Sequence, residues 1–107
     1  MAHQLGIDTI RRGSELTLSG RLDARSADLA RTVLADAVDS GAGDLVLHVG
    51  ELELWDARGV GVLVVTHRRA RQAGRRLVLA DVPPRQLRLL RATRLSRLLT
   101  VEPLAVA

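Results

Sequence analysis

Leucine and polar residues alternate near the start of the chain, with a period of two residues. Leu16 and Leu18 each stand between polar neighbours, which is the pattern of a half-buried strand. Residues 3–10 favour another strand, and the segment Arg11-Arg12-Gly13-Ser14 between the two is typical of a hairpin turn. The chain is therefore predicted to open with two short strands, at residues 3–10 and 15–20.

A helical period replaces this alternation after residue 26. Apolar positions recur with helical spacing and predict a helix, which Gly41 and Gly43 bring to an end. The apolar positions of this helix are Ala27, Ala30, Val33, Leu34, Ala37 and Val38. The next apolar run, residues 45–49, is rich in strand-forming residues and predicts a central strand buried on both faces.

A second helix is expected from just after Asp56 to about Gln72, because apolar residues again share one side of a helical projection. Gly74 stands where a C-terminal helix cap belongs. The residues expected on the buried stripe of this helix are Val60, Leu63, Val64 and His67.

The last third of the chain predicts a strand at residues 77–79 and a third helix that begins at Pro84. Leu87 and Leu90 are expected on the buried side of that helix, and a small element follows Thr100. Strands that alternate with helices predict an α/β fold with parallel pairing among the later strands.

The core must be aliphatic, because Trp55 is the only aromatic residue in 107. No window approaches the roughly 18 to 20 uncharged apolar residues that a membrane span requires, so membrane insertion is not expected. Residues 1–20 lack a secretory pattern. The absence of cysteine excludes disulfides, thiol catalysis and iron–sulfur ligation, and it fits the reducing cytoplasm, where we expect the protein to act.

Charge is divided unevenly along the chain. All 16 basic residues are arginine, and residues 1–57 carry a net charge of −5 while residues 58–107 carry +9. Such asymmetry suggests an acidic partner or nucleic acid against the second half. No base-stacking aromatics lie among these arginines and no DNA-binding motif appears, so direct nucleic-acid binding is not expected. The favoured interpretation of these arginines is a solvated surface. It also holds for the arginines at every third position from Arg85 to Arg97, because residues spaced by three spiral round a helix and do not form one basic stripe.

The residues that carry chemistry do not assemble into an enzymatic site. The three histidines have no partners at a recognised metal-ligand spacing, and no glycine-rich phosphate loop occurs. His48 is expected to be a core histidine bonded to a neighbouring group, and a functional role for it is the less favoured alternative. Glu51 and Glu53 are expected in a strand-to-turn connection, a poor arrangement for paired-carboxylate catalysis. We therefore expect no enzymatic activity, no metal and no cofactor.

Residues 52–63 depart from an ordinary strand-to-helix connection. Gly59 and Gly61 lie in the first turns of the predicted helix, where each costs about 1 kcal/mol relative to alanine. Either a partner or another backbone approaches closely there, or the glycines only permit helix-on-sheet packing; both explanations stay open. The N-terminus of such a helix also suits an anion or a phosphoryl group.

At this segment the chain resembles the STAS domain family, in particular the small single-domain anti-sigma-factor antagonists. The family signature Asp-Ser-Ser/Ala-Gly-Leu-Gly reads here Asp56-Ala57-Arg58-Gly59-Val60-Gly61, and a second motif, Gly-Glu/Arg-Leu-Asp, reads Gly20-Arg21-Leu22-Asp23. The match covers roughly residues 5–102. It implies one STAS-type α/β domain over residues 1–107, with a mixed four- or five-stranded sheet packed with three to four helices.

The resemblance also implies a regulatory role. In the family, the unmodified antagonist binds an anti-sigma factor that is also a Ser/Thr kinase, which frees the sigma factor. Phosphorylation of the first serine of the signature then breaks the complex. Asp23 and Asp56 carry over as the acids that flank this position. The implied partner-binding residues are Asp23, Asp56, Ala57, Arg58, Gly59, Val60 and Gly61.

The chain departs from the family pattern where the switch should be. Ala57 replaces the phosphoacceptor serine, Arg58 replaces a residue that is often small, and His48 stands where the preceding strand commonly has an acid. In the favoured interpretation Ala57 mimics the unmodified state, so the antagonist is always competent to bind. Alternatively, the domain has exchanged its partner and Arg58 contacts an acidic group. A further alternative is a STAS subunit of a lipid-transport ATPase complex or a scaffold of a stress-sensing assembly.

Overall fold

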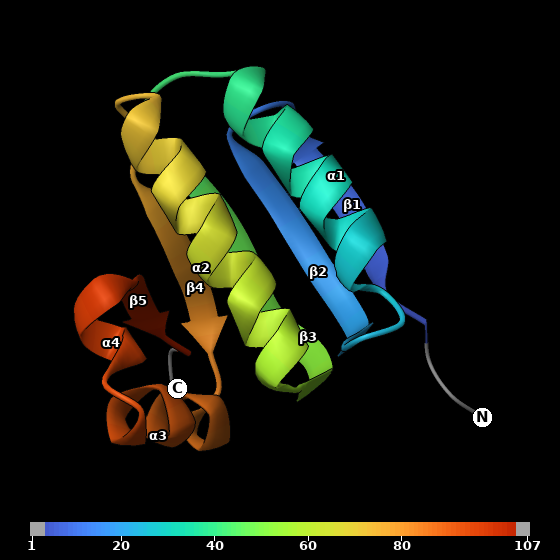
Figure 1. Ribbon diagram of the computed structural model, residues 1–107, viewed down its shortest axis with the longest axis vertical. Helices are drawn as coiled ribbons and strands as arrows, with labels where there is room; N and C mark the ends of the chain where they lie inside the picture. The colour runs from blue at the N-terminus through green and yellow to red at the C-terminus, as the bar shows by residue number, and fades with distance from the viewer. Residues whose placement is uncertain (1–3, 105–107) are drawn as a thin grey trace.

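Five strands lie side by side in the order β1-β2-β3-β4-β5, and two long helices cross one face of the sheet (Figure 1). The computed structural model describes residues 4–104. β1 is antiparallel to β2, and all later neighbours are parallel, so the sheet is mixed as expected. The elements are β1 Gly6–Arg11, β2 Glu15–Leu22, α1 Ala27–Asp39, β3 Leu45–Trp55, α2 Ala57–Gln72, β4 Leu77–Val82, α3 Pro84–Ala92, α4 Leu95–Leu98 and β5 Thr100–Pro103. The expected fold class, with five strands and four helices, is confirmed.

The core fills the space between the sheet and the helices α1 and α2. Leu18, Leu47 and Leu79 come from neighbouring strands and are completely buried. Leu34 of α1 and Leu63 of α2 are also completely buried in the same cluster. Trp55 is buried as well, so the single aromatic residue belongs to the aliphatic core.

The buried stripe of α2 differs from the predicted one. Leu63 and His67 are buried as expected, but Val60 and Val64 are only half-buried. The buried positions of the helix are Gly59, Val62, Leu63, Thr66, His67 and Ala70. Apolar residues are so frequent in this helix that their spacing leaves its rotation undetermined. The rotation is instead determined by the close approach of Gly59 to β2.

Strand β3 is longer than predicted, because it runs on to Trp55. The prediction that Glu51 and Glu53 lie in a strand-to-turn connection is therefore wrong. Both are exposed and lie within β3, one on each side of the buried residue Leu52. Pairing of this segment with the end of β2 extends the strand beyond the apolar run that its sequence pattern predicts.

The third predicted helix is divided in two. α3 ends at Ala92, and Arg94 adopts a left-handed conformation with φ of 62° before α4 begins. The arginines spaced by three residues thus belong to two short helices and their junction, not to one cylinder. All five are exposed, as the interpretation of a solvated surface requires.

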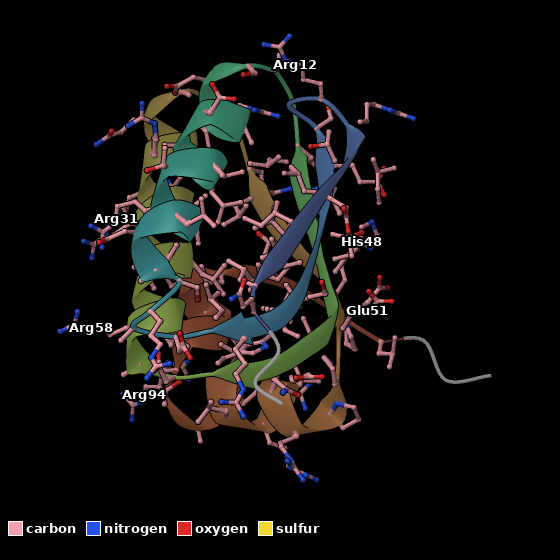
Figure 2. All side chains as sticks on the ribbon, turned by 90° about the vertical axis from the view of Figure 1, so that its right-hand side faces the viewer. Arg12, Arg31, His48, Glu51, Arg58 and Arg94 are labelled. Carbon is pink, nitrogen blue, oxygen red and sulfur yellow. The ribbon has the colours of Figure 1, made fainter. Side chains whose placement is uncertain are left out.

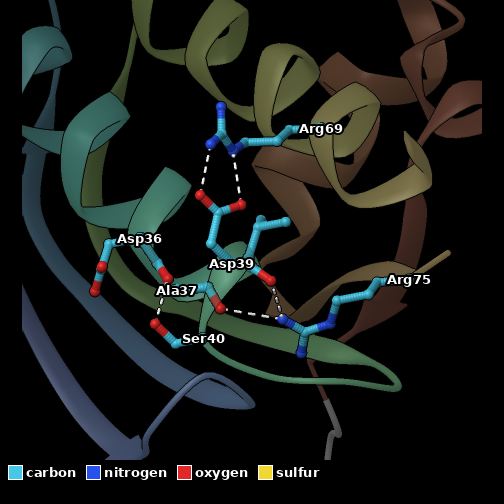
Figure 3. Close-up of polar contacts among 7 residues, drawn as sticks. Asp36, Ala37, Asp39, Ser40, Arg69 and Arg75 are labelled. Carbon is cyan, nitrogen blue, oxygen red and sulfur yellow. Dashed lines mark hydrogen bonds and ion pairs between the residues drawn. The ribbon is translucent and has the colours of Figure 1, made fainter. Parts of the chain in front are cut away.

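Two arginines connect α1 to the rest of the fold at the end of the molecule shown in Figure 3. Arg69 of α2 forms a two-pronged ion pair with Asp39, the last residue of α1, with N–O distances of 3.1 and 2.5 Å. The buried guanidinium of Arg75 donates to the carbonyl oxygens of Ala37 and Val38, at 3.0 and 2.8 Å. The C-terminal end of α1 therefore obtains the hydrogen-bond donors that a helix end lacks.

Candidate functional site

The two sequence motifs meet at the carboxyl ends of β2 and β3. In parallel α/β sheets, these strand ends are where ligands and partners usually bind. The backbone N–H of Asp56, after β3, donates to the carbonyl oxygen of Leu22, the last residue of β2, at 3.3 Å. The structure thus brings the Asp23 motif and the Asp56 motif together, although 33 positions separate them in the chain.

Asp56 caps the N-terminus of α2. Its backbone is extended and its carboxylate accepts a hydrogen bond from the backbone N–H of Gly59 at 2.9 Å. A carboxylate at this position satisfies one of the free N–H groups and lies at the positive end of the helix dipole. The side chain is half-buried, so its first contribution is to hold the start of α2 in place.

Asp23 organises the neighbouring loop in a similar way. Its carboxylate accepts hydrogen bonds from the backbone N–H groups of Arg25 and Ser26, at 3.0 and 3.3 Å. The Ser26 hydroxyl donates to the carbonyl oxygen of Arg21 at 2.8 Å and accepts from the backbone N–H of Asp23 at 3.0 Å. Sequence reasoning missed this role of Ser26. A serine one residue before a helix usually caps it, but the Ser26 hydroxyl makes no cap hydrogen bond to α1 and holds the preceding loop instead.

Gly59 and Gly61 have different explanations. A Cβ atom at Gly59 would overlap the carbonyl oxygen of Leu22, so α2 packs against β2 only because this position lacks a side chain. A Cβ atom at Gly61 would meet nothing within 4 Å, and the residue is exposed. The expected close approach of another backbone is confirmed at Gly59, where it is the contact that packs α2 on the sheet. At Gly61 neither alternative applies within the described residues, because the space beside it is open. Val60 between them is half-buried and packs against the core.

Ala57 and Arg58 are adjacent residues of the signature and both face solvent at the start of α2. Figure 2 shows Arg58 pointing away from the sheet, on the same side of the molecule as Arg31 and Arg94. A cation in the first turn of a helix is disfavoured by the helix dipole, typically by about 0.3–1 kcal/mol. Among residues 4–104 no carboxylate pairs with Arg58 to offset this cost. Ala57 has no hydroxyl to accept a phosphoryl group.

A hollow of about 590 Å³ lies beside the Asp23 loop, and sequence reasoning did not find it. Arg21, Arg25 and Leu29 contribute to its wall together with Leu5 from the segment before β1. These residues come from three places in the chain, so no local sequence pattern predicts the hollow. It extends the surface of the two motifs toward the edge of the sheet.

His48 lies on the other face of the sheet, away from α1 and α2 (Figure 2). Its ring nitrogens contact Asp81 at 2.6 Å and Glu15 at 2.5 Å. The expectation of a neighbouring hydrogen-bond partner is confirmed, but the ring is partly exposed and not in the core. The hydrogen bonds to Glu15 and to Asp81 raise the pKa of His48 above its ordinary value.

Within residues 4–104, no three histidine, aspartate or glutamate side chains are arranged so that they could hold a metal ion. No helix in this part of the chain is both long and apolar enough to cross a membrane.

Comparison of the sequence with known proteins finds a matching family and a named relative. The family described as "Mlab, STAS domain" matches residues 5–100. The "Anti-sigma F factor antagonist" of Paenibacillus polymyxa is 28% identical over 102 residues, which cover 94% of this chain and 82% of that protein.

Solved structures show the same fold at lower sequence identity. The anti-sigma factor antagonist SpoIIAA in its unphosphorylated form superposes with a TM-score of 0.70 at 16% identity, over 96% of this chain and 90% of that chain. An anti-sigma factor antagonist from Mycobacterium paratuberculosis gives a TM-score of 0.71 at 19% identity, over 94% and 85%. These similarities concern the fold, whereas the family match over residues 5–100 establishes that the chain belongs to the STAS domain family.

Proposed function

We propose that this protein is a cytoplasmic anti-sigma-factor antagonist without enzymatic activity. It binds an anti-sigma factor of the Ser/Thr kinase type and so frees a sigma factor. Support comes from family membership and from the curated relative named for this function, which spans nearly the whole chain. The partner-binding surface comprises Asp23, Asp56, Ala57, Arg58, Gly59, Val60 and Gly61, of which Gly59 is buried against β2 and supports the exposed residues beside it.

The observation that carries the proposal is the exposed start of α2. Asp56 and Asp23 hold the two loops in place through backbone hydrogen bonds, while Ala57, Arg58 and Gly61 face solvent. Arg58 lies where the helix dipole disfavours it and has no carboxylate partner within residues 4–104. A charged side chain in an unfavourable position that no neighbour offsets is expected to contact a partner molecule.

Phosphorylation does not switch this antagonist at the usual position. Ala57 lacks the hydroxyl group, so the protein stays in the binding-competent state. Ser26 is the hydroxyl nearest to the two motifs, but it already holds the Asp23 loop through two hydrogen bonds. We therefore expect intact-mass analysis to find no phosphate after incubation with the kinase and ATP.

The binding surface is tested by calorimetric titration of the purified kinase-type anti-sigma factor. Ala57→Asp should abolish binding, because it adds a negative charge to an interface that already contains acids, and an unpaired buried charge costs several kcal/mol. The melting temperature should hardly change, since a carboxylate is tolerated in the first turn of a helix. Ala42→Asp, on an exposed loop at the opposite end of the fold, is the matched control and should bind like the wild type.

Arg58 is tested in the same titration. Arg58→Ser should weaken binding if Arg58 contacts an acidic group, whereas Arg12→Ser, at the far end of the molecule in Figure 2, should not. Equal affinity of the wild type and Ala57→Asp, both folded, would move the binding surface elsewhere.

A second candidate is a STAS subunit of a lipid-transport ATPase complex or a scaffold of a stress-sensing assembly. The missing hydroxyl at Ala57 favours it, together with the exposed arginines of α3 and α4, which would suit an acidic protein surface. Co-purification of the tagged protein with a permease and an ATPase, and not with an anti-sigma factor, would select this candidate.

A further inference from the structure

A histidine between two carboxylates joins three strands on the face of the sheet that α1 and α2 leave open (Figure 2). Glu15 is the first residue of β2, His48 lies in β3, and Asp81 lies near the end of β4. The contacts measure 2.5 Å from Nε2 to Glu15 and 2.6 Å from Nδ1 to Asp81. Each carboxylate lies 33 positions from His48 in the chain, so the arrangement depends on the register of the sheet.

Both contacts can be hydrogen bonds only while the ring carries two protons. An ionised carboxylate only accepts hydrogen bonds, and a neutral imidazole donates from one nitrogen while its other nitrogen accepts. When His48 is neutral, one carboxylate therefore faces a ring lone pair and loses its bond. The other charged groups on this side are two acids and one base. Glu51 lines the hollow beside His48, Asp8 of β1 lies on the same face through its pairing with Thr17, and Arg11 of β1 is paired with Glu15.

Asp81 is held in an unusual conformation. Its φ is 59°, in the left-handed region that L-residues adopt at a cost, although it lies within a strand. The register between β4 and β5 shifts between Leu79 and Val82, so Asp81 lies in an irregularity of the sheet. Such irregularities turn a side chain in a new direction. Here the carboxylate reaches His48.

We propose that Glu15, His48 and Asp81 form a proton-dependent clamp across β2, β3 and β4, which holds the end of β4 when the imidazole carries both protons and releases it when one proton leaves. The released segment includes the contact of β4 with the C-terminal strand, where the backbone N–H of Leu104 donates to Val82 at 2.9 Å. The start of α3 at Pro84 follows two residues later. The clamp thus couples the placement of the last quarter of the chain to pH, independently of the proposed function.

The direction of the clamp's pH dependence follows from proton linkage. Because the pKa of His48 is raised in the folded state, the clamp is fully formed below the ordinary histidine value of about 6.5. It is lost as the pH rises through the raised value. For each unit by which this pKa is raised, the clamp changes the equilibrium constant for local opening of the end of β4 by about tenfold.

The test is amide hydrogen exchange followed by NMR between pH 6 and 9, expressed as protection factors so that intrinsic exchange is removed. In the wild type, the protection of Leu104 should fall as His48 titrates, by up to about tenfold for each unit by which its pKa is raised, while that of Leu34 in α1 should stay constant. In His48→Gln the fall should be absent. Asp81→Asn removes the charge but suits the left-handed backbone, and it should return the His48 titration toward its ordinary value.

A protection factor at Leu104 that is independent of pH in the wild type would overturn the clamp. The same fall in His48→Gln as in the wild type would also overturn it, because another group would then be responsible.

Discussion

At the residue scale, Arg75 connects backbone segments that lie far apart in the chain. Its guanidinium donates to Gly13 in the turn between β1 and β2, to Ala37 and Val38 at the end of α1, and to Gly43 in the loop that follows. None of these acceptors is a carboxylate. The charge is stabilised by carbonyl oxygens, including those at the negative end of a helix dipole.

Arg75→Met should lower the free energy of unfolding by about 3 kcal/mol, because several buried carbonyl groups lose a charged donor. Arg75→Lys should recover only part of this loss, since an ammonium group cannot reproduce the planar fork of donors. Urea unfolding measures both. Arg76→Met is the matched control: the neighbouring arginine is exposed and pairs with Asp44 at the surface, so its removal should change stability little. Equal effects at positions 75 and 76 would contradict this account.

His67 should make the protein less stable in acid. Burial in α2 lowers its pKa, and the charges of Arg71 and Arg68 lower it further. The unfolded chain therefore takes up a proton near pH 6.5 while the folded protein takes it up only at lower pH, so stability falls as the pH drops below about 6.5. Urea midpoints between pH 4 and 7 should show this fall in the wild type and a weaker one in His67→Gln. The fall below pH 6.5 should persist in His48→Gln, because the contribution of His48 to stability changes only above that pH.

At the element scale, the position of α2 depends on one glycine and not on the other. Gly59→Ala should lower the free energy of unfolding by about 1–3 kcal/mol, since its Cβ would overlap Leu22 and force the helix away from β2. Gly61→Ala should raise it by about 1 kcal/mol, because the site is open and alanine is the better helix former. Thermal unfolding of the two variants measures both changes in stability. Two changes of the same sign would show that the contact of Gly59 with Leu22 does not position the helix.

Sequence periodicity predicts the elements whose apolar pattern is unambiguous. α1 and the ends of α2 agree with the structure, because spacing, caps and glycine stops all indicate the same boundaries. The rotation of α2 could not be predicted, since valines occur around much of the helix. The length of β3 was underestimated because pairing with β2, a tertiary contact, extends it through Glu51 and Glu53.

At the scale of the whole molecule, the helix side and the open face of the sheet present different charged side chains (Figure 2). Arg31, Arg58 and Arg94 point outward on the helix side in Figure 2, whereas His48 and Glu51 lie on the open face of the sheet. The helix side carries the signature and is suited to a partner with acidic groups.

The motifs predicted where the candidate site lies, but not what each side chain does there. The order and spacing of the Asp23 and Asp56 motifs indicated that they belong together, and the structure joins them through Leu22. The inward hydrogen bonds of both carboxylates follow from loop conformation, which spacing does not encode. The partners of His48 could not be found from the sequence, since sheet register alone brings Glu15 and Asp81 to it.

The most direct test of the central claim is release of a labelled sigma factor from its kinase-type anti-sigma factor in the presence of ATP. The wild-type protein should release the sigma factor and keep it released throughout the incubation, because Ala57 cannot be phosphorylated. Ala57→Ser should release it at first and then lose this ability as phosphate accumulates at the restored hydroxyl, if the kinase recognises the loop. Failure of the wild type to release any sigma factor, or a decline of its release with time, would contradict the account.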